Sequence, residues 1–220
     1  MEMRRPALPK IITQNLRLHI IISTAVRIII FLILARELYT KNWLFAFAAA
    51  MMLFVSFLPS IIAKKYKIFL PSEFDLLFSI FLFSSFILGE MRDYYIRYWW
   101  WDLMLHSIFA FMLGMAGFSI LYSLYLTEKI KSSAFLASFF SFCFSLSLGA
   151  LWEIIEFSID YLLGTNMQKS GLVDTITDLM VDTLGALLAS ALGYLYIKKV
   201  KLFVFDAFIG RFIRIERKLR

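Results

Sequence analysis

Residues 134–163 read AFLASFFSFCFSLSLGALWEIIEFSIDYLL, and this stretch decides what kind of fold the chain adopts. Its first part, up to Trp152, contains no charged side chain and is long enough to cross a hydrocarbon layer about 30 Å thick. Three carboxylates follow, at Glu153, Glu156 and Asp160. A transmembrane helix with acids near one end is expected to turn them towards other helices, because charge exposed to lipid is costly.

The rest of the chain has the same apolar character. Hydrophobic residues make up 61% of the 220 residues, and the mean hydropathy is +0.77, whereas a soluble domain is roughly half apolar. Apolar runs of transmembrane length lie at Leu18–Ala35, Trp43–Ala63, Phe69–Gly89, Trp101–Leu126, Ala134–Leu163 and Val173–Ile197. We therefore predict an all-α integral membrane bundle of about six transmembrane helices, with one domain over residues 1–200 and a tail over residues 201–220.

Composition and charge argue against several other classes of protein. The single cysteine, Cys143, cannot form an intramolecular disulfide. The net charge of +7 comes from basic residues beside apolar runs, without the pattern of a nucleic-acid-binding module, so no nucleic-acid partner is predicted. No small-residue cleavage site closes the first apolar run, so we expect a transmembrane helix there and not a cleaved signal peptide.

The basic residues predict the orientation of the helices. Of the 23 Lys and Arg residues, all but six fall on the side that holds both termini. The positive-inside rule then places both termini in the cytoplasm. We therefore predict a multi-pass protein of the cell (inner) membrane. Trp43 and the aromatic residues of 94–101 fall at the predicted outer boundary, where Trp and Tyr are enriched.

The tail over residues 201–220 combines two kinds of side chain at helical spacing. Its apolar members are Phe205, Phe208, Ile209 and Phe212, and its basic members are Arg211, Arg214, Arg217 and Lys218. This pattern predicts a basic amphipathic helix that binds anionic lipid of the inner leaflet. The alternative is a stop-transfer cluster of charges with a frayed end.

Eight ionisable residues fall within the last three predicted helices. They are Asp102 and His106, then Glu153, Glu156 and Asp160, then Asp174, Asp178 and Asp182. Within each helix the spacing of three, four or seven residues places them on one face. The predicted topology places all eight in the outer half of the membrane, where they are expected to line a polar pocket open to the outside.

So many carboxylates in a medium of low dielectric constant need a neutralising partner. Divalent cations, shared protons or basic side chains could each serve, and the nearest basic candidates in sequence are Arg92, Arg97 and Arg27. All eight residues are candidate metal ligands, and oxygen-rich ligation with one imidazole suits Mg²⁺, Mn²⁺ or Ca²⁺. His106 is also a candidate acid or base.

Simpler roles are open for some of the eight residues. Asp174 precedes a predicted helix and could be its N-cap. Asp102 and Asp160 could be solvated at the membrane interface, and Asp182 could be a protonated donor between helices. The four deep carboxylates, Glu153, Glu156, Asp178 and Asp182, are the strongest candidates for a functional site, because charge at that depth is rarely retained for packing alone.

The order of motifs resembles a known group of bacterial proteins. The motifs are Trp101-Asp102-x3-His106, Trp152-Glu153-x2-Glu156-Phe157, Gly164-Thr165 and Asp174-Thr175-x2-Asp178-Leu179-Met180. They resemble the YjdF-type inner-membrane proteins and, more loosely, the VanZ-like proteins, over roughly residues 89–195. Glu156 stands where the VanZ-like pattern has Gln, and Asp182 where it tends to have Asn. The resemblance implies an envelope location and a shared site, without implying a reaction.

Two functions follow from these observations. The first is a membrane protein whose acidic pocket binds cations or relays protons in an envelope accessory or transport-like role. The second is a metal-dependent intramembrane enzyme that acts on an amphiphilic or lipid-phosphate substrate, with His106 as acid or base. Against the enzyme, the sequence offers no Gly-rich phosphate loop and no evident nucleophile.

The predicted topology can be tested by cysteine accessibility labelling. A cysteine at position 92 or 169 is expected to react with a membrane-impermeant reagent added from outside, because the basic-residue asymmetry places both positions there. Labelling of position 169 only after the membrane has been breached would reverse the orientation.

Overall fold

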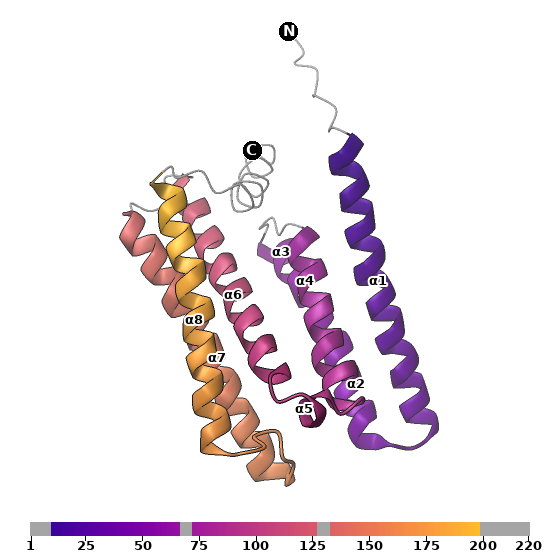
Figure 1. The fold of residues 1–220 in the computed structure, drawn as a ribbon. Coiled ribbons are helices and arrows are strands. Elements are labelled where there is room, and N and C mark those ends of the chain that lie inside the picture. Colours follow the sequence, from indigo (N-terminus) through magenta and orange to yellow (C-terminus); the bar gives the residue numbers. More distant parts are fainter. Residues whose placement is uncertain (1–9, 67–71, 127–132, 199–220) are drawn as a thin grey trace. The chain divides into compact units, whose positions relative to one another are not determined.

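The computed structural model describes residues 10–66, 72–126 and 133–198, and all regular structure in these ranges is helical. The chain forms two compact units, residues 1–92 and 93–220, which are described separately (Figure 1). Within the described ranges, five helices are long and apolar enough to cross a membrane. The predicted all-α membrane bundle is confirmed, and the predicted single domain over residues 1–200 stays a prediction.

The first unit is built on a long helix, α1 (Lys10–Tyr39). It packs against α2 (Trp43–Ser56) and α4 (Ser72–Leu82). A short helix, α3 (Leu58–Tyr66), follows α2 after a break at Phe57. The break lies two residues before Pro59, whose ring has no N–H group to donate to the carbonyl of Val55 and clashes with it, so the predicted single helix over Trp43–Ala63 is interrupted.

The third predicted span, Phe69–Gly89, differs from expectation. The described part begins as α4 and continues as a π-helix, η1 (Phe83–Glu90). Glu73, Asp75 and several serines make this segment less apolar than the other spans, and Ser and Gly are weak helix formers. Five candidate membrane spans are therefore found in the described ranges, where six were expected, and one of the five, Trp43–Ile61, contains the break between α2 and α3.

A partly buried ion pair joins the helices of the first unit. Arg27 Nη2 of α1 lies 2.6 Å from Asp75 Oδ1 of α4 and donates to the backbone carbonyl of Ser56, 2.8 Å away. The carbonyl is within reach because α2 ends at Ser56. The Arg27 guanidinium also lies 4.9 Å from the centre of the Phe57 ring. Arg27 is thus neutralised inside the first unit, by Asp75.

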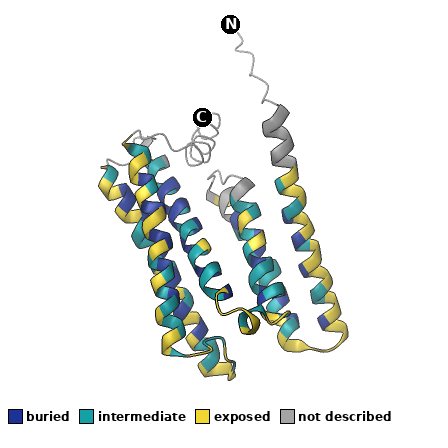
Figure 2. Cartoon of the chain, in the orientation of Figure 1, coloured by how far each residue is buried: buried dark blue, intermediate teal, exposed yellow. Residues whose placement is uncertain are grey.

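The second unit is a bundle of three long helices. After the short α5 (Tyr94–Arg97), it contains α6 (Trp101–Leu126), α7 (Ala134–Leu163) and α8 (Leu172–Ile197). Their boundaries agree with the predicted spans to within a residue. Each long helix packs against the other two, and their buried residues face one another, while exposed residues face outward (Figure 2).

Small residues let these three helices approach closely. Gly185, Ala189 and Gly193 of α8, spaced four residues apart, are buried where α8 packs against α6. A Cβ atom added at Gly185 would lie 2.5 Å from the backbone oxygen of Ser107 in α6. Two further hydrogen bonds cross from α7 to α6, from Ser141 Oγ to Gly114 O at 2.7 Å and from Ser145 Oγ to Ala110 O at 2.6 Å. They satisfy buried hydroxyls where no water is present to do so.

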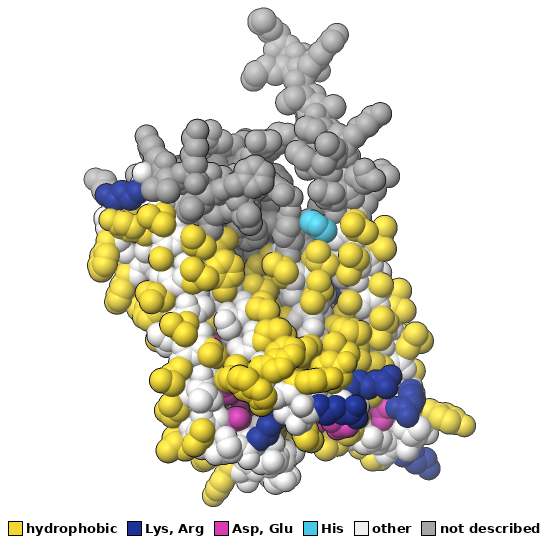
Figure 3. Space-filling model, in the orientation of Figure 1, with side chains coloured by type: hydrophobic (Ala, Val, Ile, Leu, Met, Phe, Trp, Pro, Cys, Tyr) yellow, Lys and Arg dark blue, Asp and Glu magenta, His cyan; other side chains and the backbone are white. Residues whose placement is uncertain are grey.

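The outward faces of the helices are apolar. Leu151, Ile154, Phe157, Leu184 and Leu188 are all more than half exposed. Apolar side chains likewise dominate the face shown in Figure 3. Such surfaces suit a lipid environment, because only there is exposed apolar area not penalised. The predicted lipid-binding tail over residues 201–220 lies outside the described residues.

The close approach at Gly185 predicts a large effect of one added methyl group. Gly185→Ala is expected to lower the free energy of unfolding by about 1–3 kcal/mol, because the obstructing Ser107 oxygen belongs to the backbone and cannot rotate away. Thermal unfolding of the detergent-solubilised protein measures the change. Ala191→Val, at an exposed position of α8, is the control and should have little effect. Equal melting of both variants would contradict the close packing.

Candidate functional site

The candidate site lies at one end of the three-helix unit, where α6 begins, α7 ends and α8 begins. Six ionisable residues form what we call the acidic cluster: Asp102, His106, Glu153, Glu156, Asp178 and Asp182. All but Asp102 are buried, with at most 9% of each residue exposed. Each of the three helices contributes two members, so the polar faces predicted from sequence spacing do point into one bundle.

His106 lies at the centre of the acidic cluster. Its Nδ1 atom is 3.4 Å from both carboxylate oxygens of Asp182. Its Nε2 atom is 3.8 Å from Asp102 Oδ1 on its own helix and 3.8 Å from Glu153 Oε1 of α7. One imidazole therefore faces carboxylates from all three helices, two of them on its Nε2 side.

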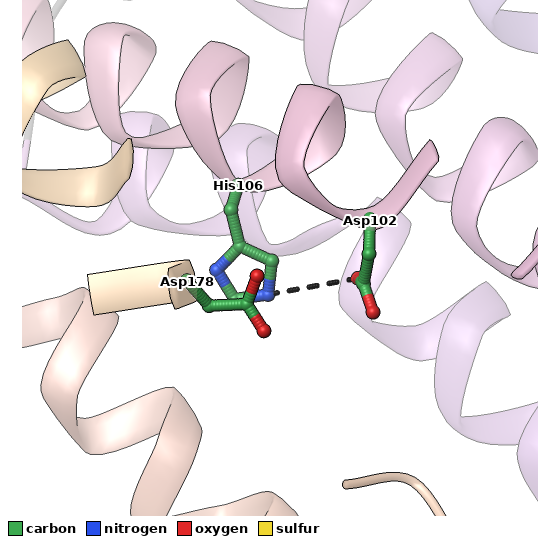
Figure 4. A group of neighbouring side chains, drawn as sticks. All are labelled: Asp102, His106 and Asp178. Carbon is green, nitrogen blue, oxygen red and sulfur yellow. Dashed lines mark ion pairs between the residues drawn. The ribbon is translucent and has the colours of Figure 1, made fainter. Parts of the chain in front are cut away.

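Asp178 is the most deeply buried member of the cluster. Only 1% of it is exposed, and neither carboxylate oxygen has a hydrogen-bond partner among the residues that the structure describes. One ligand atom each from Asp102, His106 and Asp178 lie within 4.8 Å of one another, and Figure 4 shows the Asp178 carboxylate against the imidazole ring. Both oxygens of Glu153 also lack a hydrogen bond, although the Thr175 hydroxyl lies near them. Two buried acids thus have unused ligand atoms.

The other two buried acids have defined structural neighbours. Glu156 Oε1 accepts a hydrogen bond of 2.8 Å from Trp152 Nε1, one turn earlier on α7. Asp182 lies against Gly149 of α7, where an added Cβ atom would collide with its carboxylate. The glycine therefore makes the room that lets Asp182 reach His106.

Asp160 does not join the cluster. Its carboxylate instead organises the connection between α7 and α8. Oδ1 accepts from Thr165 Oγ1 at 2.6 Å and from Met167 N at 2.7 Å, and Oδ2 accepts from Gln168 N at 2.8 Å. Asp160 accepts three hydrogen bonds and so acts as a clamp for this loop. This role was not among those predicted for it.

Asp174 lies at the rim of the cluster. The residue that caps α8 is Gly171, and Asp174 is in the first turn of the helix, so Asp174 is not the N-cap, the simpler role that the sequence left open for it. A carboxylate in the first turn still interacts favourably with the helix dipole. Asp174 is half-buried and is not among the three residues whose ligand atoms converge.

Lys169 is a member of the site that the sequence analysis did not single out. Its Nζ atom lies 2.8 Å from Asp102 Oδ2 and 4.3 Å from the centre of the Tyr95 ring. Two of the three basic candidates have other partners: Arg97 pairs with Asp93 at 3.5 Å, and Arg27 pairs within the first unit. The sequence did contain a pointer to this contact, because Lys169 is the only basic residue in the connection between α7 and α8, next to the predicted acidic helix ends.

Comparison with known proteins identifies the family of this chain. Residues 18–199 match the model of a family described as predicted membrane protein (DUF2238). The chain belongs to this family. It is therefore a predicted multi-pass membrane protein, as composition implied, and the family's description does not carry the YjdF or VanZ name. No solved structure matches the chain.

The chain also resembles a protein whose function is not characterised. An uncharacterized protein of Thermotoga maritima is 30% identical over 130 residues. The alignment covers 57% of this chain and 64% of the relative, which is less than two thirds of its length. The family description supports a membrane location, while the orientation of the termini stays a prediction.

The role of Asp160 as a clamp leads to a local prediction. Asp160→Ala is expected to speed amide hydrogen exchange at Met167 and Gln168 by about tenfold or more, because both amides lose a charged acceptor. Exchange measured by mass spectrometry on peptides from this loop tests it. Asp160→Asn keeps one acceptor oxygen and should have a smaller effect. Unchanged exchange in the alanine variant would contradict the clamp.

Proposed function

We propose that the second unit binds a divalent cation between His106, Asp102 and Asp178, and that the protein is a cation-binding protein of the cell envelope. The observation that carries this proposal is the Asp178 carboxylate, which is buried, has no donor and lies with ligand atoms of Asp102 and His106. A buried carboxylate without a partner is costly, and a bound cation removes that cost.

The spacing of the candidate ligands suits a metal ion. Two ligand atoms that each lie roughly 2.0–2.4 Å from one ion are separated by about 3–4.5 Å. The 3.8 Å distances from His106 Nε2 to Asp102 Oδ1 and Glu153 Oε1 fall in this range. Small rotations of the carboxylates would therefore complete the coordination, with Glu153 available as a fourth ligand.

Asp182 suits the role of an orienting partner. A metal-binding histidine commonly donates its second ring N–H to a carboxylate, which fixes the ring and its tautomer. His106 Nδ1 faces Asp182 at 3.4 Å, so a proton on Nδ1 leaves the Nε2 lone pair directed at Asp102 and Glu153. Gly149 is part of this arrangement, because a side chain at that position would occupy the space of the Asp182 carboxylate.

The ligand chemistry narrows the choice of ion. Carboxylates with one imidazole favour Mg²⁺, Mn²⁺ or Ca²⁺, and Mn²⁺ accepts this mixed set most readily of the three. The predicted topology would place the ion in the outer half of the membrane, consistent with an envelope accessory or transport-like role. Binding is proposed in preference to catalysis, because the converging ligand atoms support an ion and identify no reacting group.

Titration calorimetry of the purified protein with Mn²⁺, Mg²⁺ and Ca²⁺ tests the site. Saturable binding is expected, with a rise in the free energy of unfolding of about 2.7 kcal/mol when free ion reaches 100 times the dissociation constant. Asp178→Asn should abolish both effects, because an amide is a much weaker ligand. Asp93→Asn, at an exposed residue of the same unit, is the matched control and should bind as the unmodified protein does.

A different outcome would favour shared protons as the neutralising agent. In that case no saturable heat is expected, and Asp178→Asn should be at least as stable as the unmodified protein, since an amide resembles a protonated acid. This pair of results would refute the proposed cation site.

A further inference from the structure

The positively charged side chain of Lys169 lies at the edge of the acidic cluster, beside Asp102. The Lys169 ammonium group is bound by Asp102 Oδ2 at 2.8 Å and covers the face of Tyr95 at 4.3 Å. A carboxylate and the face of an aromatic ring are also the groups that bind free cations in proteins. Lys169 side-chain exposure is 30% and that of Asp102 is 19%, so the pair lies at the boundary between the cluster and its surroundings.

The loop that carries Lys169 is held in place by its own hydrogen bonds. Asp160 binds two of its backbone amides, and Gln168 Nε2 donates to Thr175 Oγ1 of α8 at 2.7 Å. Gly164 and Gly171, at its two ends, adopt positive φ angles that strain other residues. Lys169 is thus presented to Asp102 from an ordered loop.

Asp102 is shared between this lysine and the proposed ion site. Its Oδ1 atom faces His106 Nε2 at 3.8 Å, while its Oδ2 atom binds Lys169. A divalent cation bound by Asp102 would therefore lie close to the ammonium group, and like charges at such a distance repel strongly in a partly buried setting. Ion and lysine compete for one carboxylate.

We propose that Lys169 is a specificity-determining residue of the cation site, a tethered competitor that must leave Asp102 before a divalent ion binds. This inference rests on the proposed cation site. Without the ion, Lys169 neutralises Asp102 and holds the loop against α6. With the ion bound, the ammonium group is released towards solvent. The lysine therefore weakens the site and sets the ion concentration at which it fills.

Calorimetric titration with Mn²⁺ tests this role. Lys169→Met is expected to bind Mn²⁺ roughly tenfold more tightly than the unmodified protein, because a charged hydrogen bond to Asp102 no longer has to be broken. Lys169→Arg keeps the positive charge and should stay within about threefold of the unmodified protein. Arg97→Gln removes one positive charge from the same unit outside the cluster and is the matched control, with no expected change.

The outcomes separate this inference from the proposed function. Binding by the unmodified protein with equal affinity in Lys169→Met would overturn the competitor role and leave the ion site intact. Binding seen only in Lys169→Met would support the competitor role in its strongest form. Absence of binding in both proteins would refute the ion site and the competitor role together.

A second measurement uses the unmodified chain and so does not depend on the folding of a variant. Saturating Mn²⁺ is expected to raise the rate at which an amine-reactive reagent modifies Lys169 by several-fold, while the rate at Lys41 of the first unit stays constant. Mass spectrometry of the labelled peptides gives both rates. An unchanged rate at Lys169 in protein shown by calorimetry to be saturated would overturn the proposal.

Discussion

Charge buried in an apolar medium is the constraint on which the second unit depends. Each ionisable side chain within a membrane span costs at least about 2.5 kcal/mol when it meets lipid alone. In this protein α6, α7 and α8 each turn two such residues inward, and His106 faces carboxylates from all three helices. The helices must stay packed for this arrangement to persist, so the acidic cluster and the bundle stabilise each other only as a unit.

Close packing is what makes the shared interior available. Gly185 and Gly193 bring α8 against α6, and Gly149 opens a space in α7 for the Asp182 carboxylate. Ser141 and Ser145 then satisfy their hydroxyls on carbonyls of α6. Small residues therefore serve two purposes here, since they permit close helix contact and also position a member of the cluster.

The first unit also contains charge within an apolar helix, and there a single ion pair neutralises it. One arginine, Arg27, is neutralised by Asp75 and also takes up the carbonyl left free where α2 ends at Ser56. The charges of the two units are balanced differently. Arg27 has an opposite charge 2.6 Å away, whereas the buried carboxylates of Asp178 and Glu153 accept no hydrogen bond from the residues that the structure describes, and Glu153 has only His106 Nε2 at 3.8 Å as an ion-pair partner. That imbalance is the reason we propose an ion-binding role for the second unit.

The sequence by itself determined the membrane class, the all-α fold, the boundaries of α6, α7 and α8 and the inward faces of His106, Glu153, Asp178 and Asp182. These follow from hydrophobic run length and helical periodicity, which are local properties. Only the tertiary structure decided the partners. It showed that Asp160 clamps a loop, that Lys169 and not Arg97 reaches Asp102, and that Phe83–Glu90 is a π-helix. Such choices depend on which side chains meet across helices and loops, and spacing along one helix does not contain that information.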